Sequence, residues 1–139
     1  MASPITGGNP TEAGRSLLPT LETSVRGMTL QQRFLEIIAR NIANANTTRT
    51  AEGGPYRRQI GVASEGTGGP TAEISQDSQP GRLVYDPGHP DANEAGFVEY
   101  PNVDSETEIV DLMVARRAFE ANASVFEAAK NMLKRAMEI

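Results

Sequence analysis

Residues 105–139, SETEIVDLMVARRAFEANASVFEAAKNMLKRAMEI, decide the fold of this chain. Their apolar side chains recur with helical spacing, and neither Gly nor Pro interrupts them. The first apolar stripe is Ile109, Leu112, Phe119, Ala123, Phe126, Leu133 and Met137. The second stripe is Val110, Val114, Ala121, Val125, Ala128, Met132 and Ile139. At 1.5 Å per residue this predicted helix is roughly 50 Å long.

Both ends of the predicted helix carry terminal signals. Ser105 and Glu108 match the S-x-x-E capping box, in which each side chain bonds the other residue's backbone amide. Acidic residues gather at the start, and Lys130, Lys134 and Arg135 stand near the end, where the helix dipole favours each charge. We therefore predict a helical segment over residues 104–139, capped by Ser105 and Glu108.

A second helical pattern covers residues 20–48. Its first stripe is Leu18, Leu21, Val25, Met28, Leu35, Ala39 and Ile42, and its second is Leu30, Phe34, Ile37 and Ile38. Gly27 costs about 1 kcal/mol relative to Ala inside a helix, so it marks either a bend or a close helix approach. Asn41 and Asn44 lie three residues apart on one face, where they are placed to bond across a tight helix seam. Asn46 and the two threonines after it are expected to end the helix.

The other two parts of the chain are rich in Gly and Pro. Residues 1–19 hold few apolar side chains, so we predict a disordered leader. Residues 49–103 contain extended candidates at 56–63, 71–74, 82–85 and 97–100, separated by turn sequences, which indicates one or two β-hairpins. The expected fold is mainly α with a small β insertion, in which the long N- and C-terminal helices pair as a coiled coil.

Two apolar stripes on each helix predict a partner outside this chain. A two-helix hairpin buries one seam, and four or five large side chains left in water on each helix forfeit roughly 6 to 15 kcal/mol. That exceeds the stability of so small a core, so the partner is another chain or more copies of this one. The residues expected to pack between helices or subunits are Leu21, Val25, Gly27, Met28, Leu35, Asn41, Ile42, Asn44, Ile109, Leu112, Phe119, Asn122, Phe126 and Leu133.

Composition excludes several classes of function. The net charge is -5 and the pI is about 4.9, which disfavours nucleic acid as a partner. Between Glu52 and Glu108 there are eleven acidic and three basic residues, so the two flanks carry the positive charge. The absence of cysteine removes disulfides, thiolate zinc sites and cysteine nucleophiles. The N-terminus does not match a Sec signal peptide, and no apolar run approaches the roughly 18 residues of a membrane-spanning helix.

No residue set predicts catalysis, a metal or a cofactor. His89 lies in DPGHPD, where Asp86 and Asp91 are conceivable co-ligands, but Asp-Pro-Gly is first a turn sequence and the turn interpretation is preferred. No serine-nucleophile motif or phosphate loop is present. Residues 56–58, Tyr-Arg-Arg, either bind an acidic partner or pair internally at a strand start, and internal pairing is preferred.

Four segments together give the chain a resemblance to a known family. They are NIANANT (41–47), PYRR (55–58), YDPGHPDANEAGFVEYPNVD (85–104) and EIVDLMVARRAFEANASVFEAAKNML (108–133). The chain resembles the bacterial flagellar rod and hook axial proteins, and the match over residues 85–104 is typical of the proximal rod branch. The chain departs from the family in its longer lead and in Arg26-Gly27-Met28, where Ser-Gly-Leu is usual. The retained glycine supports a structural role for Gly27.

The resemblance implies a non-enzymatic axial subunit without cofactor, small-molecule substrate or membrane insertion. Copies of the chain and other rod proteins would stack through the terminal helices into a hollow, torque-transmitting rod in the periplasmic part of the basal body. The flagellar type III export apparatus would deliver it without signal-peptide cleavage. Two alternatives stay open. A soluble helical adaptor or secretion-chaperone-like protein would form a discrete oligomer, and a wall-cleaving hydrolase would need two positioned carboxylates.

Overall fold

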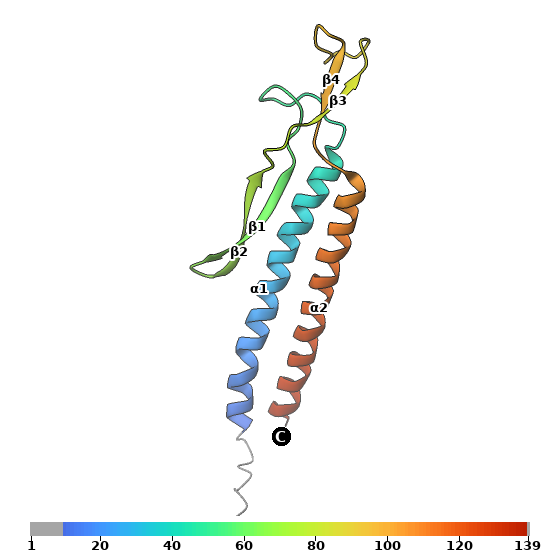
Figure 1. Cartoon of the computed structure of the whole chain (residues 1–139). Helices are drawn as coiled ribbons and strands as arrows, with labels where there is room; N and C mark the ends of the chain where they lie inside the picture. The colour runs from blue at the N-terminus through green and yellow to red at the C-terminus, as the bar shows by residue number, and fades with distance from the viewer. Residues whose placement is uncertain (1–9, 139) are drawn as a thin grey trace, which may run out of the picture.

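The computed structural model describes residues 10–138 of the 139-residue chain. In chain order the elements are α1 (Pro10–Ala43), β1 (Gln59–Gly66), β2 (Gly69–Gln76), β3 (Arg82–Tyr85), β4 (Phe97–Tyr100) and α2 (Ser105–Met137). The two helices lie side by side in opposite directions, β1 and β2 lie beside α1, and β3 and β4 extend beyond the helix pair (Figure 1). The expectation of a mainly α fold with a small β insertion is confirmed.

Helix α1 begins earlier than the sequence predicted. It starts at Pro10 rather than near Thr20, so residues 10–19 of the predicted leader form its first turns. Pro19 lies inside the helix, where proline removes one backbone hydrogen bond, and this local penalty is why the sequence pattern placed the start too late. Gly14 packs beside Leu133 of α2, with 3.7 Å between its ideal Cβ position and Leu133 Cδ1. Contact with α2 therefore supports these turns. Residues 1–9 of the predicted leader, and Ile139, lie outside the described residues.

The helices approach each other closely at Gly27. An ideal Cβ built on Gly27 would lie 2.8 Å from both Asn122 Nδ2 and Asn122 Oδ1, so a methyl group there would require the Asn122 side chain to move. Of the two interpretations of Gly27, the structure shows the close approach. Ala115 and Ala129 of α2 are buried, as expected where small side chains let two helices pack tightly. Half-buried along the pair are Leu21, Met28, Leu35, Ile42, Leu112, Phe119, Asn122, Phe126 and Leu133.

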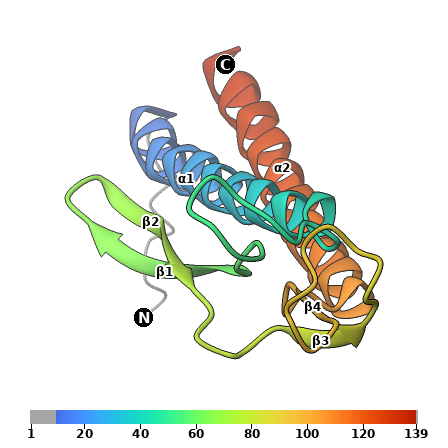
Figure 2. The same cartoon turned by 90° about the horizontal axis from the view of Figure 1, so that it is seen from above.

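The β1–β2 hairpin covers the second stripe of α1. The strands pair antiparallel from Gln59↔Gln76 to Gly66↔Gly69, and Gly69 takes a φ of +114° that suits glycine at the turn. Gly61 lies against Phe34 and Ile37, with 3.1 Å between its ideal Cβ position and Ile37 Cδ1. Figure 2 shows the hairpin alongside α1. The expected exposure of a second stripe on both helices is therefore wrong for α1, because the β insertion folds back onto it.

The β3–β4 hairpin presents two unlike faces. Its register is Arg82↔Tyr100, Leu83↔Glu99, Val84↔Val98 and Tyr85↔Phe97, so side chains at 84 and 98 share one face and those at 83, 85, 97 and 99 share the other. Val98 is fully buried. Leu83, Tyr85 and Phe97 are exposed. One face thus packs on the rest of the chain and the other is apolar and open to solvent.

Candidate interaction surfaces

A buried polar cluster joins both helices to the β1–β2 hairpin. Asn41 of α1 and Glu108 of α2 are each only 1% exposed. Asn41 Nδ2 donates to the Gln59 carbonyl oxygen at 2.8 Å and to Glu108 Oε2 at 3.4 Å. Asn41 Oδ1 accepts from the Gln59 amide at 2.9 Å and from the Tyr56 hydroxyl at 2.8 Å. Asn41 of α1 therefore pairs with both backbone polar groups of Gln59 at the start of β1, and it also bonds to Glu108 of α2.

Arg58 supplies the positive charge of this cluster. Its Nε donates to Glu108 Oε1, its Nη1 lies 3.4 Å from Asp77 Oδ2, and its Nη2 lies 3.8 Å from Asp111 Oδ2. Burial lowers the pKa of Arg58, but the hydrogen bonds and charges of Glu108 and Asp77 outweigh it and raise the pKa overall. Burial also raises the pKa of the Tyr56 hydroxyl. The internal pairing expected for this segment is confirmed at Arg58, whereas Arg57 is exposed.

The start of α2 is capped by a residue that the sequence did not single out. Asp104 is the N-cap, its Oδ1 accepts from the Glu106 amide at 3.2 Å, and its Oδ2 accepts from the Thr107 hydroxyl at 2.6 Å. The Thr107 hydroxyl, followed by the Glu106 amide, lowers the pKa of Asp104. The predicted capping box of Ser105 and Glu108 is therefore wrong. Arg58 draws the Glu108 side chain inward, and the cap lies one residue earlier than the box requires.

The predicted asparagines divide into two kinds. Asn41 does bond across to α2, as described above. Asn44 instead donates to the Arg40 carbonyl oxygen at 2.8 Å and accepts from the Thr47 hydroxyl at 3.2 Å, so within this chain it closes the end of its own helix. Asn122 donates to the Ala118 carbonyl oxygen at 3.0 Å while its amide group lies over Gly27. The seam role expected for Asn44 is not seen within the single chain.

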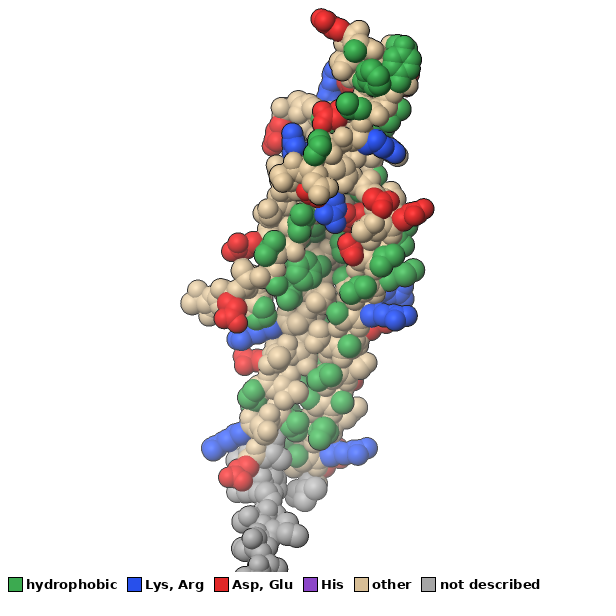
Figure 3. Space-filling model, viewed as in Figure 1, with side chains coloured by type: hydrophobic (Ala, Val, Ile, Leu, Met, Phe, Trp, Pro, Cys, Tyr) green, Lys and Arg blue, Asp and Glu red, His purple; other side chains and the backbone are tan. Residues whose placement is uncertain are grey.

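The second stripe of α2 is exposed along the helix. Val110, Val114, Val125 and Met132 are between 48% and 63% exposed, and Ala121 and Ala128 between them are exposed too. None of these positions carries a charge. Figure 3 shows hydrophobic side chains along the visible length of α2. The exposed stripe that the sequence predicted for this helix is confirmed.

A second apolar surface lies on α1. Leu18, Leu21 and Val25, with Glu22 and Arg26 beside them, line an open hollow of about 650 Å³. Leu18 is 56% exposed, Val25 45% and Ile109 of α2 44%, although the sequence placed Val25 and Ile109 in a packed seam. The two apolar surfaces lie on different helices and are built from different residues, so they are not equivalent.

The acidic side chains and His89 form no metal site within residues 10–138. No group of three or more His, Asp or Glu side chains in this range is placed to hold a metal ion. The His89 amide donates to the Asp86 carbonyl oxygen at 3.1 Å, and His89 Nδ1 accepts from the Asp91 amide at 3.0 Å, as the turn interpretation expects. Neither described helix has the length and apolar character to cross a bilayer.

Comparison with known proteins points to one family. The family model described as "Flagella basal body rod protein" matches residues 21–49, and that of the "Flagellar basal body rod FlgEFG protein C-terminal" matches residues 94–139. The chain is 35% identical to the flagellar basal-body rod protein FlgC of Borreliella burgdorferi, over 88% of this chain and 97% of that protein. It is also 35% identical to FlgC of Bacillus subtilis, over 86% and 95% of the two chains. FlgC of Escherichia coli O157:H7 is 34% identical over 89% and 98%.

Proposed function

The chain belongs to the FlgC family of flagellar basal-body rod proteins, and from this premise we propose that it polymerises through its two long helices into the hollow shaft of the rod. It is a structural subunit of the rod and not an enzyme, so the hydrolase alternative is set aside. The observation that carries the proposed mode of assembly is the exposed, uncharged stripe of α2.

This stripe has the spacing of a helix-packing seam. Its members follow one another at intervals of three, four or seven residues, as the a and d positions of a coiled coil do. Because its four large side chains are already about half buried, covering the rest of their surface would contribute roughly 3 to 6 kcal/mol, half of the 1.5 to 3 kcal/mol that full burial of each would give. We propose that α1 and α2 form a coiled-coil pair and that a helix of a neighbouring subunit covers the stripe.

The hollow on α1 is the surface that we propose the α2 stripe of a neighbouring subunit binds. If the stripe of one subunit packs against the Leu18, Leu21 and Val25 surface of the next, each contact joins two unlike surfaces. Contacts of this kind generate rings or open helical polymers instead of closed dimers. The neighbours in the proposed rod are copies of this chain and other rod proteins.

The remaining parts of the chain fit the same proposal. Helices α1 and α2 would form the helical core of the subunit, the segment 49–103 would contact adjacent subunits, and the residues before α1 would assist export. We propose that the flagellar type III apparatus delivers the chain into the periplasmic part of the basal body without signal-peptide cleavage, as its resemblance to the rod proteins implies.

A pair of neighbouring substitutions tests the proposed seam. Val125→Glu places a charge in the centre of the stripe, whereas Ser124→Glu places the same charge one position away, on an exposed polar part of α2. In a strain that lacks the native protein, Val125→Glu should abolish rod assembly and motility, and Ser124→Glu should preserve both. Circular dichroism of the purified chains should show equal helix content. Normal motility with Val125→Glu would contradict the proposal that a neighbouring subunit packs against the α2 stripe.

A further inference from the structure

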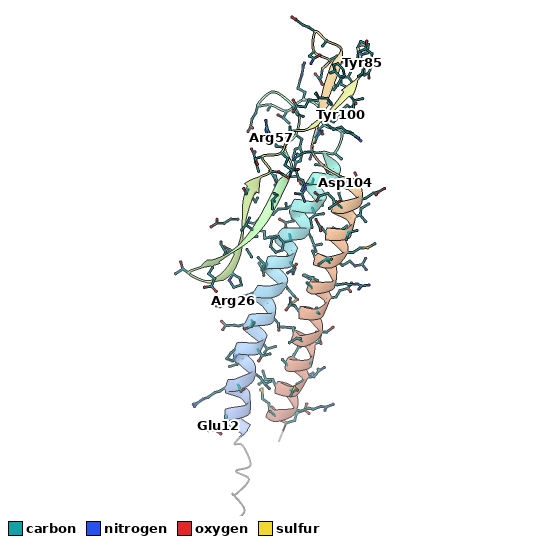
Figure 4. The ribbon with its side chains drawn as sticks, viewed as in Figure 1. Glu12, Arg26, Arg57, Tyr85, Tyr100 and Asp104 are labelled. Atoms are coloured by element: carbon teal, nitrogen blue, oxygen red, sulfur yellow. The ribbon has the colours of Figure 1, made fainter. Side chains whose placement is uncertain are left out.

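Met132 is the one sulfur-bearing side chain of the α2 stripe. It is 59% exposed, and the other members of the stripe are hydrocarbon side chains. Figure 4 shows side chains of α2 that project away from α1 along the helix, which begins just after Asp104. The Met132 thioether is therefore open to small reagents in the unassembled chain, whereas the proposed seam would cover it.

The chemistry of a thioether makes this position sensitive to peroxides. Because the chain contains no cysteine, methionine is the side chain that a peroxide oxidises most readily. A lone pair of the sulfur forms a bond to one oxygen of hydrogen peroxide, and the O–O bond breaks. The released hydroxide takes the proton of the transferred OH group and leaves as water. The sulfur loses two electrons, the peroxide gains them, and the product is methionine sulfoxide, which methionine sulfoxide reductases convert back.

The α2 stripe offers no hydrogen-bond donor to the new sulfoxide oxygen. Val125 and Ala128, which precede Met132 in the stripe, have apolar side chains. Arg135 is exposed, and its position is rotated about 60° from that of Met132 around the helix axis. Packing the oxidised stripe against an apolar surface would bury a polar group without a partner, which disfavours the contact at least about fivefold.

We propose that Met132 is a modification site at which a peroxide controls the entry of this chain into the rod. Oxidation of the unassembled chain prevents the α2 stripe from packing against a neighbouring subunit. A chain already in the rod is protected, because its neighbour covers the sulfur. The inference rests on the proposed function, and it adds a means of regulation to the seam that the α2 stripe would form.

Met113 provides an internal control for the chemistry. It lies on the same helix and is 60% exposed, but it is not a member of the stripe. Its position is rotated about 100° from that of Met132 around the helix axis. The purified full-length chain is treated with dilute hydrogen peroxide, and peptide mass spectrometry measures the sulfoxide at each position. The two methionines should oxidise at similar rates, and a Met132 that resists oxidation while Met113 reacts would overturn the proposal.

Substitution by glutamine tests the effect on assembly, because glutamine is polar and similar in length to methionine sulfoxide. In a strain that lacks the native protein, full-length Met132→Gln is expressed together with the native chain. The share of each chain in isolated basal bodies is then compared with its share in whole cells. Met132→Gln should be depleted about fivefold, whereas Met113→Gln and Met132→Leu should enter as often as the native chain. Undiminished entry of Met132→Gln, or equal depletion of Met113→Gln, would count against the proposed site.

Competition between the native chain and Met132→Leu tests the action of the peroxide itself. The leucine variant cannot form the sulfoxide at this position, and both chains meet the same export apparatus and the same neighbours in one cell. They are expressed together, with and without hydrogen peroxide at a dose that oxidises a measurable part of Met132 in unassembled chains. The native share of the basal bodies should fall only with peroxide. A native share that peroxide leaves unchanged would contradict control through Met132.

The redox inference and the proposed function can fail separately. If Val125→Glu blocks rod assembly but Met132→Gln enters as often as the native chain, the redox inference fails while the proposed function stands. Normal rods with Val125→Glu would instead contradict the seam on which both rest.

Discussion

Glu108 illustrates how a single residue changes its role when the chain folds. Its position three residues after Ser105 matches a local capping pattern. In the folded chain Arg58, which is fifty positions earlier, binds its carboxylate, and Asn41 donates to its other oxygen. A carboxylate that is 1% exposed is stable only when its charge and its acceptor sites are matched. Its main contribution is therefore to hold three elements together.

Removal of this carboxylate should destabilise the monomer strongly. Glu108→Ala leaves Arg58 and Asn41 without their shared partner, and breaking a buried ion pair costs about 3 kcal/mol or more. Chemical denaturation followed by circular dichroism measures the change. Ser105→Ala is the matched control and should be nearly neutral, because Asp104 provides the cap. Equal losses for the two variants would favour the capping box after all.

Asp104 should make the stability of α2 depend on pH in acid. Its folded-state pKa is lowered by the Thr107 hydroxyl and the Glu106 amide, so its charge contributes fully above the unfolded-state pKa of about 3.9. The contribution disappears as the pH falls through the folded-state pKa. Asp104→Asn keeps a capping oxygen without the charge, so the melting temperatures of the native chain and this variant should converge between pH 6 and pH 2, roughly the span over which an aspartate titrates. A difference that stays constant over this span would contradict the assignment.

At the scale of elements, the distance between α1 and α2 is set by small residues. Gly27 and the Asn122 amide occupy one crossing point, while Gly14, nearer the helix end, leaves ordinary contact distance to Leu133. Glycine weakens a helix at both positions by about 1 kcal/mol relative to alanine. Only at Gly27 would an added methyl group displace a side chain of the neighbouring helix.

The two glycines should therefore respond oppositely to the same substitution. Gly14→Ala should raise the free energy of unfolding by up to about 1 kcal/mol, because it improves helix propensity and the added methyl group meets Leu133 at ordinary contact distance. Gly27→Ala should lower it, since the added methyl group overlaps the Asn122 side chain. Adding Asn122→Ala to Gly27→Ala should recover much of the loss. Thermal melts of these variants and the native chain measure the effects, and a stabilising Gly27→Ala would show that the helices are not in tight contact there.

The β1–β2 hairpin determines which apolar surface of α1 stays exposed to a partner. It covers Phe34 and Ile37 of α1, so the apolar surface left for assembly on that helix is the Leu18, Leu21 and Val25 region, closer to its start. Helix α2 receives no such cover and keeps its second stripe exposed. The two helices, although similar in length and pattern, therefore offer unlike surfaces.

At the scale of the whole molecule, unlike surfaces are separated in space. The β3–β4 hairpin lies at one end of the molecule and the last turns of α2, with Lys134 and Arg135, lie at the other, while the β1–β2 hairpin runs alongside α1. The exposed apolar residues likewise form separate surfaces on α1, on α2 and on the β3–β4 hairpin. A rod subunit has to bind neighbours on several sides without closing into a dimer, and surfaces that do not match themselves meet that requirement.

The sequence by itself determined what depends on neighbours along the chain. Helical spacing predicted both long helices and the exposed stripe of α2, the turn sequence placed His89, and the runs at 82–85 and 97–100 coincide with β3 and β4. Only the tertiary structure decided which distant groups meet: Arg58 with Glu108, Asn122 over Gly27, and the hairpin over Phe34 and Ile37. It also extended α1 back to Pro10, since contact with Leu133 offsets a local proline penalty. Backbone periodicity and turn preference act over a few residues, whereas ion pairing and packing depend on which elements the fold brings together.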